Sequence, residues 1–401
     1  MIHMNNDKIT YYVGASEIIN KPIPPYSEIV CDFLDELSRR LRADSDGKKF
    51  SDVIAFAFWC RKGNIQKLKK EFDGKYVRIG RGVVFHIAPS NVPVNFAFSF
   101  VFGLLSGNCN IVRVSSKQFK QTELICNVVR DLFEQDKFAE LKKRNAIVSY
   151  EADQEITDYY SSISEARIIW GGDETIAQIR KSPIAARSID VTFADRYSFA
   201  VLSAEAVMEL SEDQLNTLAE NFYNDTFYID QNACSSPHLV LWKSKNPDMT
   251  EEAKIKFWNQ VKVVAEKYDL EDIKVSDKYT LLCEQAVSFK EIDHAYCYDN
   301  LIYVARLRRL PERLSTLRGK FGVFYEMEIS NFDVLAESIS AEFQTCLVFG
   351  INKNEIVDFI VKNNLRGIDR IVPIGKALDI NIVWDGYDII GTLSRVISCQ
   401  D

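Results

Sequence analysis

The stretch that decides the fold reads GVVFHIAPSNVP and occupies residues 82–93. Its first half is apolar enough for a buried strand, and its second half is a turn with prolines on both sides of Ser90-Asn91. An apolar run suited to a core helix follows, and a second strand begins after the turn Gly107-Asn108. Strand, helix and strand in this order form a βαβ unit, so the sequence predicts a parallel sheet.

The same alternation continues along the chain and predicts an α/β fold with two parallel-sheet lobes. Helices are expected first at Ser27–Leu41 and Asp52–Lys70, where apolar residues recur at helical spacing. The expected strands of the first lobe are 83–87, 111–114, 146–149, 167–170 and 188–192. The second lobe is expected to contain helices at 212–221 and 250–268, strands at 238–242 and 344–349, and a strand-rich region that runs through residue 304. The predicted domains are 1–200, 201–370 and a C-terminal segment, 371–401.

Composition narrows the class of protein. A net charge of −8 and a pI near 5.3 argue against a nucleic-acid-binding surface. The nine cysteines lack the pairing and clustering of a disulfide framework or a zinc site, which predicts a reducing, cytoplasmic location. The four histidines are widely separated, so no metal centre is expected. The longest apolar stretch, Val92 to Leu105, is too short to span a bilayer.

The segment DQNACSSP, residues 230–237, surrounds Cys234 with small polar residues. This context favours a thiol at the start of a helix, where backbone N–H groups and the helix dipole stabilise the thiolate that attacks carbonyl carbon. A buried, inert cysteine is the alternative. The upstream turn supports catalysis, because its prolines hold the Asn91 amide in place and a fixed amide beside a thiol can form an oxyanion hole.

These motifs resemble the aldehyde dehydrogenase superfamily, and within it the LuxC-type fatty acyl-CoA reductases. The Asn91 turn, the strand after Gly107-Asn108 and DQNACSSP carry the resemblance, together with RIVPIG at 370–375 and VWDGYD at 383–388. The resemblance implies an aldehyde-dehydrogenase-like fold of two Rossmann-like lobes with the active site between them. It also implies Cys234 as nucleophile, Asn91 as oxyanion donor and a homo-oligomer.

The resemblance further implies a nicotinamide cofactor lined by Arg113, Ser115, Gly171 and Gly172. A glycine turn before a helix can admit a phosphate, although such turns are also ordinary helix entries and Asp173 would repel an anion. Arg113 stands where most of the family has lysine. Its guanidinium would clamp a 2′-phosphate and favour NADPH over NADH, or it is simply an exposed strand end.

Two family positions differ in this chain. Arg318-Gly319-Lys320 stands where the family has a glutamate that contacts the nicotinamide ribose, so that contact is not carried over. Thr192 falls where hydrolytic aldehyde dehydrogenases keep a glutamate base, and a threonine cannot abstract a proton at neutral pH. Asp195 is a candidate substitute base, and His238 is a candidate for lowering the pKa of Cys234, although its strand-like context points it elsewhere.

The sequence therefore predicts a reductase that converts an acyl thioester to an aldehyde with NADPH, NADH being the alternative, through an S-acyl cysteine. The expected substrate is a fatty acyl-CoA or an acyl-protein, with an acyl-protein synthetase as a partner. A phosphate-releasing acyl-phosphate reductase of the same superfamily and a non-catalytic acyl-binding subunit are the alternatives.

Overall fold

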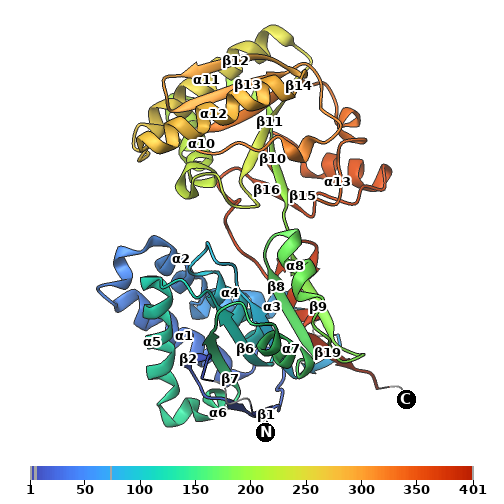
Figure 1. Ribbon diagram of the computed structural model, residues 1–401. Coiled ribbons are helices and arrows are strands. Elements are labelled where there is room, and N and C mark those ends of the chain that lie inside the picture. Colours follow the sequence, from blue (N-terminus) through green and yellow to red (C-terminus); the bar gives the residue numbers. More distant parts are fainter. Residues whose placement is uncertain (1, 4–6, 73–74, 400–401) are drawn as a thin grey trace. The chain divides into compact units, whose positions relative to one another are not determined.

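The computed structural model describes residues 2–3, 7–72 and 75–399. The chain divides into two compact units: unit 1 is Met1–Ala194 with Tyr387–Asp401, and unit 2 is Asp195–Gly386. Each unit contains an open, mostly parallel sheet with helices packed against it (Figure 1). The predicted α/β class with two Rossmann-like sheets is confirmed.

Unit 1 is built on a six-stranded sheet in which β2 is antiparallel to its neighbour and the other pairs are parallel. In spatial order the strands are β2 (Thr10–Val13), β7 (Asn145–Ser149), β6 (Cys109–Val114), β5 (Val83–Ile87), β8 (Ala166–Trp170) and β9 (Ile189–Phe193). The helices are α1 (Glu28–Ala43), α2 (Ser51–Trp59), α3 (Lys62–Glu71), α4 (Asn95–Leu105), α5 (Lys120–Phe133), α6 (Ala139–Lys142), α7 (Gln154–Ser162), α8 (Asp173–Ile179) and α14 (Ile389–Thr392). Short strands complete the unit: β1 (Ile2–His3) pairs with β3 (Glu17–Ile18), β4 (Val77–Gly80) pairs with β19 (Ser394–Ile397), and β18 is Tyr387–Asp388.

The βαβ unit forms the centre of this sheet. Every residue of β5 is buried, as expected for a strand covered on both faces. His86 faces α4, with Nδ1 2.8 Å from the Ser99 hydroxyl and Nε2 3.0 Å from the Asn110 side-chain oxygen. Burial lowers the pKa of His86 to about 4, so this histidine is a neutral core residue that fixes α4 on the sheet.

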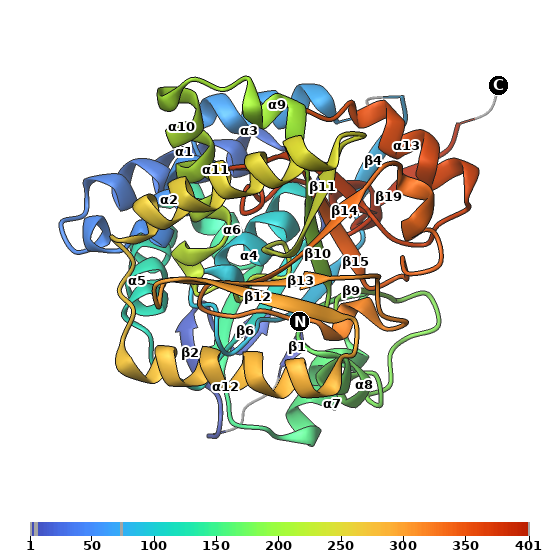
Figure 2. The ribbon, with the colours of Figure 1, turned by 90° about the horizontal axis from the view of Figure 1, so that it is seen from above.

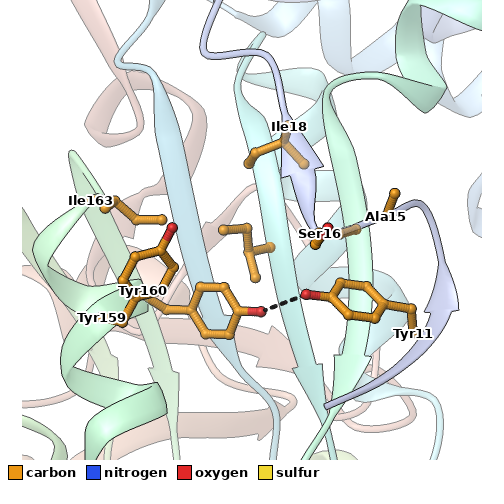
Figure 3. A pocket seen from close by; sticks show the side chains of 9 residues that line it. Tyr11, Ala15, Ser16, Ile18, Tyr159, Tyr160 and Ile163 are labelled. Carbon is orange, nitrogen blue, oxygen red and sulfur yellow. Dashed lines mark hydrogen bonds between the residues drawn. The ribbon is translucent and has the colours of Figure 1, made fainter. Parts of the chain in front are cut away.

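The other face of the unit 1 sheet is covered by α7 and α8. Figure 3 shows Tyr11 of β2 and Tyr160 of α7 meeting there, with their hydroxyl oxygens 3.4 Å apart. The cavity beside them has a volume of about 10 Å³, room for one water molecule. A dinucleotide therefore cannot fit in this cavity.

Unit 2 is built on a seven-stranded sheet in which β12 is antiparallel to β13 and the other pairs are parallel. In spatial order the strands are β12 (Ile292–Tyr298), β13 (Ile302–Leu307), β14 (Val323–Ile329), β11 (Pro237–Lys243), β10 (Tyr197–Ser203), β15 (Phe343–Phe349) and β16 (Arg370–Pro373). The remaining elements are α9 (Ala204–Met208), α10 (Glu212–Asp225), α11 (Pro247–Ala265), α12 (Asp272–Ser288), α13 (Lys353–Lys362) and β17 (Val383–Trp384). Helices α10 and α11 pack on one face, and α12 and α13 pack on the other, as Figure 2 shows for α11 and α12.

Three local expectations differ from the structure. The helix expected at Asp52–Lys70 is two helices, because the chain turns after Trp59 and the Asn64 side chain caps the Trp59 carbonyl at 2.7 Å. The region expected to be rich in strands contains helix α12, whose buried side includes Lys278. Because the buried side of α12 includes polar residues, the sequence lacks the regular spacing of apolar residues that predicts a helix. The domain boundary expected at residue 200 falls inside β10, and unit 2 begins earlier.

Within the described residues, no helix has both the length and the apolar character needed to cross a bilayer.

Candidate active site

Cys234 lies in a turn of unit 2 between the short 3-10 helix η3 (Phe227–Ile229) and β11. The chain reverses sharply before it, since Asp230 and Gln231 both have positive φ, at 56° and 62°. The expectation that Cys234 starts a helix is therefore wrong. The next element is the strand β11, so Cys234 does not lie at the N-terminus of a following helix.

The buried side chain of Gln231 fixes this turn. Its Nε2 donates to the carbonyls of Pro237 at 3.1 Å and Val323 at 3.0 Å, and its Oε1 accepts from the Gly322 N–H at 3.3 Å. The Ser198 hydroxyl donates to the Cys234 carbonyl at 2.7 Å. These bonds tie the cysteine turn to the starts of β10 and β14, which gives the thiol a defined position.

Two lysines of α12 brace the same region. Lys274 pairs with Asp230 at 3.2 Å. The Lys278 ammonium donates to the carbonyls of Leu301 at 2.8 Å and Phe321 at 2.9 Å. Burial lowers the pKa of Lys278 to about 7. Lys278 therefore binds the turn at residues 321–323 that Gln231 also contacts. It lies on the buried side of α12, whose polar residues explain why the sequence did not predict this helix.

The thiol itself is surrounded by three polar side chains. Gln344 Nε2 donates to Cys234 Sγ at 3.3 Å and to Asp385 Oδ1 at 2.6 Å, and Arg196 Nη1 lies 3.6 Å from the same carboxylate oxygen. Burial of the sulfur raises the pKa of Cys234 to about 11. The Asp385 charge raises it further, whereas Gln344 and Arg196 oppose the shift. All four residues belong to unit 2, at the amino ends of β10, β11 and β15 or on the segment after β17.

The segment that carries the RIVPIG and VWDGYD motifs forms part of this cluster. Arg370 donates to the Ala377 carbonyl at 2.7 Å and stacks on Trp384 with 4.6 Å from its Cζ to the ring centroid. Asp225, at the end of α10, accepts from the N–H groups of Gly375 and Ala377. Burial raises the pKa of Asp225 to about 6. These contacts hold in place the chain that leads to Asp385.

His238 has a partner other than the thiol. Its Nδ1 accepts from the Gly319 N–H at 3.2 Å, and its ring packs 5.5 Å from that of Tyr197. Burial, followed by the charge of Arg318, lowers the pKa of His238 to about 3. His238 is thus a neutral histidine bound to the segment in which the family's glutamate is replaced.

The candidate residues of unit 1 gather at one edge of its sheet. Asn91 follows β5, Arg113 and Ser115 lie at the end of β6, and Gly171-Gly172 follows β8. The three strands are adjacent and parallel, and Ile87 is in register with both Arg113 and Ile169. All five residues therefore lie at the carboxyl edge, where open α/β sheets bind their ligands. The Asn91 residue is exposed there.

Arg113 is half-buried and packs against a tyrosine. Its guanidinium carbon lies 4.4 Å from the centroid of the Tyr150 ring, and Nη2 donates to the Tyr150 carbonyl at 3.3 Å. No described residue accepts a hydrogen bond from its buried Nε. The contacts with Tyr150 therefore restrain the guanidinium at the carboxyl end of β6.

The remaining candidate positions are described by their backbone contacts and their place in the fold. The Gly171 N–H donates to the Phe193 carbonyl at 3.2 Å, and Gly172 directly precedes α8. Thr192 is a strand residue of β9 paired with Ile169. Asp195, the candidate substitute base, is an exposed residue at the start of unit 2.

Sequence reasoning missed Gln344, Asp385 and Arg196 as site residues. The sequence predicts Gln344 only as part of the strand 344–349, and Asp385 only as part of the VWDGYD motif. The available signal was the polarity of Gln344-Thr345 at the start of an otherwise apolar strand, because a buried amide needs hydrogen-bond partners.

Solved structures similar to this chain are aldehyde dehydrogenases and related enzymes. The NAD-dependent benzaldehyde dehydrogenase of Corynebacterium glutamicum matches with a TM-score of 0.59 and 12% identity, over 98% of this chain and 95% of that one. The glyceraldehyde-3-phosphate dehydrogenase of Methanocaldococcus jannaschii, complexed with NADP, matches with a TM-score of 0.61 and 11% identity, over 92% and 88%. A bifunctional proline utilization A protein matches with a TM-score of 0.57 and 15% identity over 86% of this chain, which spans 38% of that longer chain. The fold is therefore that of the aldehyde dehydrogenases.

The sequence family described as Acyl-CoA reductase (LuxC) matches residues 62–396. The chain belongs to this family, and the resemblance found from the motifs is confirmed. A sequence comparison with curated proteins finds no match.

Proposed function

We propose that this protein reduces an acyl-CoA thioester, with a fatty acyl group, to the aldehyde with NADPH through an S-acyl intermediate on Cys234. The observation that carries the proposal is the Cys234 turn. Gln231 and Ser198 fix its backbone, and the Gln344 amide donates to its sulfur. Membership of the acyl-CoA reductase family favours a thioester substrate over an acyl phosphate.

The first half of the reaction is acyl transfer. The Cys234 thiolate attacks the carbonyl carbon of the thioester, and the carbonyl oxygen becomes an oxyanion. The Asn91 amide and the Cys234 backbone N–H donate to that oxygen, whose charge exists only around the transition state. The bond between carbonyl carbon and CoA sulfur then breaks, CoA leaves as a thiolate, and Cys234 carries the acyl group.

The second half converts the acyl group to an aldehyde. NADPH, when bound, supplies the hydride. The same two donors hold the oxygen of the resulting thiohemiacetal, which collapses to release the aldehyde and return the Cys234 thiolate.

The carboxyl edge of the unit 1 sheet fits the cofactor. Arg113 lies at this edge, where Tyr150 orients its guanidinium. Such a group suits a 2′-phosphate, which NADPH has and NADH lacks. Ser115 and Gly171-Gly172 would line the same edge. The M. jannaschii enzyme of similar fold is complexed with NADP, which supports a nicotinamide cofactor.

The absence of a carboxylate at Thr192 favours reduction over hydrolysis. A threonine in a strand cannot activate water, so the acyl enzyme should persist until CoA or hydride removes the acyl group. The partners we propose are an acyl-CoA or acyl-protein donor, an acyl-protein synthetase and further copies of this chain. We place the protein in the cytoplasm, since the nine cysteines are all free.

The test is oxidation of NADPH with acyl-CoAs of increasing chain length, with the aldehyde trapped as a hydrazone. Aldehyde formed in proportion to NADPH consumed supports the proposal. In parallel, enzyme loaded with labelled acyl-CoA and freed of excess should lose label slowly in water and quickly when CoA is added. Rapid loss to free acid in water alone would identify a hydrolytic enzyme, with Asp195 the first base to replace.

A further inference from the structure

The side chain of Gln344 is held in one orientation beside the nucleophile. It is 1% exposed, and its amide nitrogen uses one N–H on Cys234 Sγ at 3.3 Å and the other on Asp385 Oδ1 at 2.6 Å. Its oxygen accepts from the Thr345 hydroxyl at 3.2 Å. A flipped amide would place its oxygen against the carboxylate, so the N–H groups must face the sulfur and Asp385.

The carboxylate that orients this amide is itself fixed. Asp385 is 7% exposed and follows Trp384, which is stacked under Arg370. Arg196 lies 3.6 Å from Asp385, bonds Asp369 and donates to the Phe343 carbonyl at 3.0 Å, directly before Gln344. One guanidinium therefore joins the carboxylate to the start of the strand that carries Gln344.

Besides Gln344, the groups that favour the thiolate are Arg196 and the Cys234 backbone N–H. A strand follows Cys234, and the charged groups that act on it are Asp385, which disfavours the thiolate, and Arg196, which favours it. Arg370, on the neighbouring segment, also interacts electrostatically with the Cys234 thiolate. An N–H donor bonds a thiolate more strongly than a thiol, so the Gln344 amide favours the reactive form.

We propose that Gln344 is a catalytic residue, whose amide N–H stabilises the Cys234 thiolate, and that Asp385 and Arg196 are positioning residues that aim this amide at the sulfur. The inference rests on the proposed role of Cys234 as nucleophile. The VWDGYD motif then has a specific role, because its Asp385 supplies the carboxylate that orients the Gln344 amide.

A purely structural role for Gln344 makes a different prediction. A buried glutamine that only satisfies Asp385 would affect stability but leave the reactivity of the thiol unchanged. The readout is therefore the rate at which iodoacetamide alkylates Cys234 between pH 7 and 10 without substrate or cofactor. Peptide mass spectrometry follows the Cys234 peptide alone, so the exposed Cys283 and Cys297 do not contribute.

Gln344→Met keeps the length of the side chain and removes the donor. The pKa of Cys234 should rise by about one unit or more, and alkylation at pH 8 should slow several-fold, the higher nucleophilicity of the more basic thiolate offsetting part of the effect. Asp385→Asn keeps an acceptor for the amide and removes the negative charge, so alkylation should become several-fold faster. Gln260→Met, on α11 where Gln260 bonds Asn216 at 2.9 Å, is the matched control and should react at the wild-type rate.

The alkylation rate is expected to fall in Gln344→Met and to rise in Asp385→Asn. A non-specific disturbance of the fold would change both rates in the same direction. A wild-type alkylation rate in Gln344→Met overturns the role of Gln344. Asp385→Ala removes the acceptor as well as the charge, so it should react more slowly than Asp385→Asn. Equal rates in these two variants overturn the positioning role of Asp385. Because no acyl donor is present, failure of the proposed function appears separately, as a wild-type protein that does not form aldehyde.

Discussion

The two units share a sheet architecture but carry their candidate site residues at opposite ends of it. In unit 1, Asn91 and Gly171 follow β5 and β8, and Arg113 lies at the carboxyl end of β6. In unit 2, Cys234 and Gln344 lie at the amino ends of β11 and β15. Carboxyl ends of parallel strands lead into helix N-termini, where N–H groups suit anionic ligands. Amino ends offer no such groups.

The charged groups near the candidate residues also differ between the two units. Burial raises the pKa of Cys234 to about 11, and Asp385 adds to the shift. Its thiolate must therefore be stabilised by side chains such as Gln344 and Arg196. In unit 1, by contrast, Arg113 places a positive group at the carboxyl edge, and Tyr150 holds its guanidinium. Under the proposed function, the carboxyl edge of unit 1 binds the charged cofactor and the amino edge of unit 2 carries the nucleophile.

The largest expected effect is loss of the nucleophile in unit 2. Cys234→Ala should lower aldehyde formation by at least ~10³-fold, because no other thiol replaces the covalent step. It should also abolish the acyl adduct that intact mass detects after incubation with acyl-CoA. Cys283→Ala removes an exposed cysteine of α12 and is the control. An acyl adduct that persists in Cys234→Ala would place the nucleophile elsewhere.

The next effect tests the carboxyl edge of unit 1. Asn91→Ala should lower kcat by about 10²–10³ with little change in KM, because it removes a donor to charge that exists only around the transition state. The exposed position of Asn91 means that the melting temperature should stay within a few degrees of wild type. A change in KM alone would make Asn91 a substrate-binding residue and not an oxyanion donor.

The pH dependence of stability tests the amino end of unit 2. Burial raises the pKa of Asp225 to about 6, so the folded state holds this proton more tightly than the unfolded chain does. The stability that this provides is present below about pH 4 and is lost as pH rises through 6. Between pH 4.5 and 7 the wild type should lose about 2 kcal/mol of unfolding free energy that Asp225→Asn does not lose. Urea denaturation of both proteins at both pH values gives this difference, and equal pH dependence would show that Asp225 is not buried in this way.

The smallest effect concerns cofactor choice. If Arg113 holds a 2′-phosphate, Arg113→Ala should raise KM for NADPH by roughly tenfold and leave KM for NADH nearly unchanged, as expected for loss of one charge-assisted pair. Steady-state kinetics with both cofactors make the comparison. Equal effects on the two would mean that Arg113 contacts a group that both cofactors share.

The sequence by itself determined the architecture and the family. Apolar runs such as 83–87 and 238–242 predicted buried strands because a parallel sheet covered on both faces needs continuous apolar segments. The motif around Cys234 identified the LuxC-type reductases because its residues are consecutive in the sequence, so it can be recognised without the fold. Local pattern was insufficient for α12, since a helix with Lys278 and Gln285 on its buried side has no apolar stripe.

Only the tertiary structure decided what surrounds the thiol. Arg196, Cys234, Gln344 and Asp385 are far apart in the sequence, and parallel pairing of β10, β11 and β15 brings the first three to one edge of the sheet. The same pairing makes the Cys234 turn lead directly into β11, so the thiol does not lie at a helix start. Hydrogen bonds across such separations depend on strand order and register, and no local pattern in the chain encodes either of them.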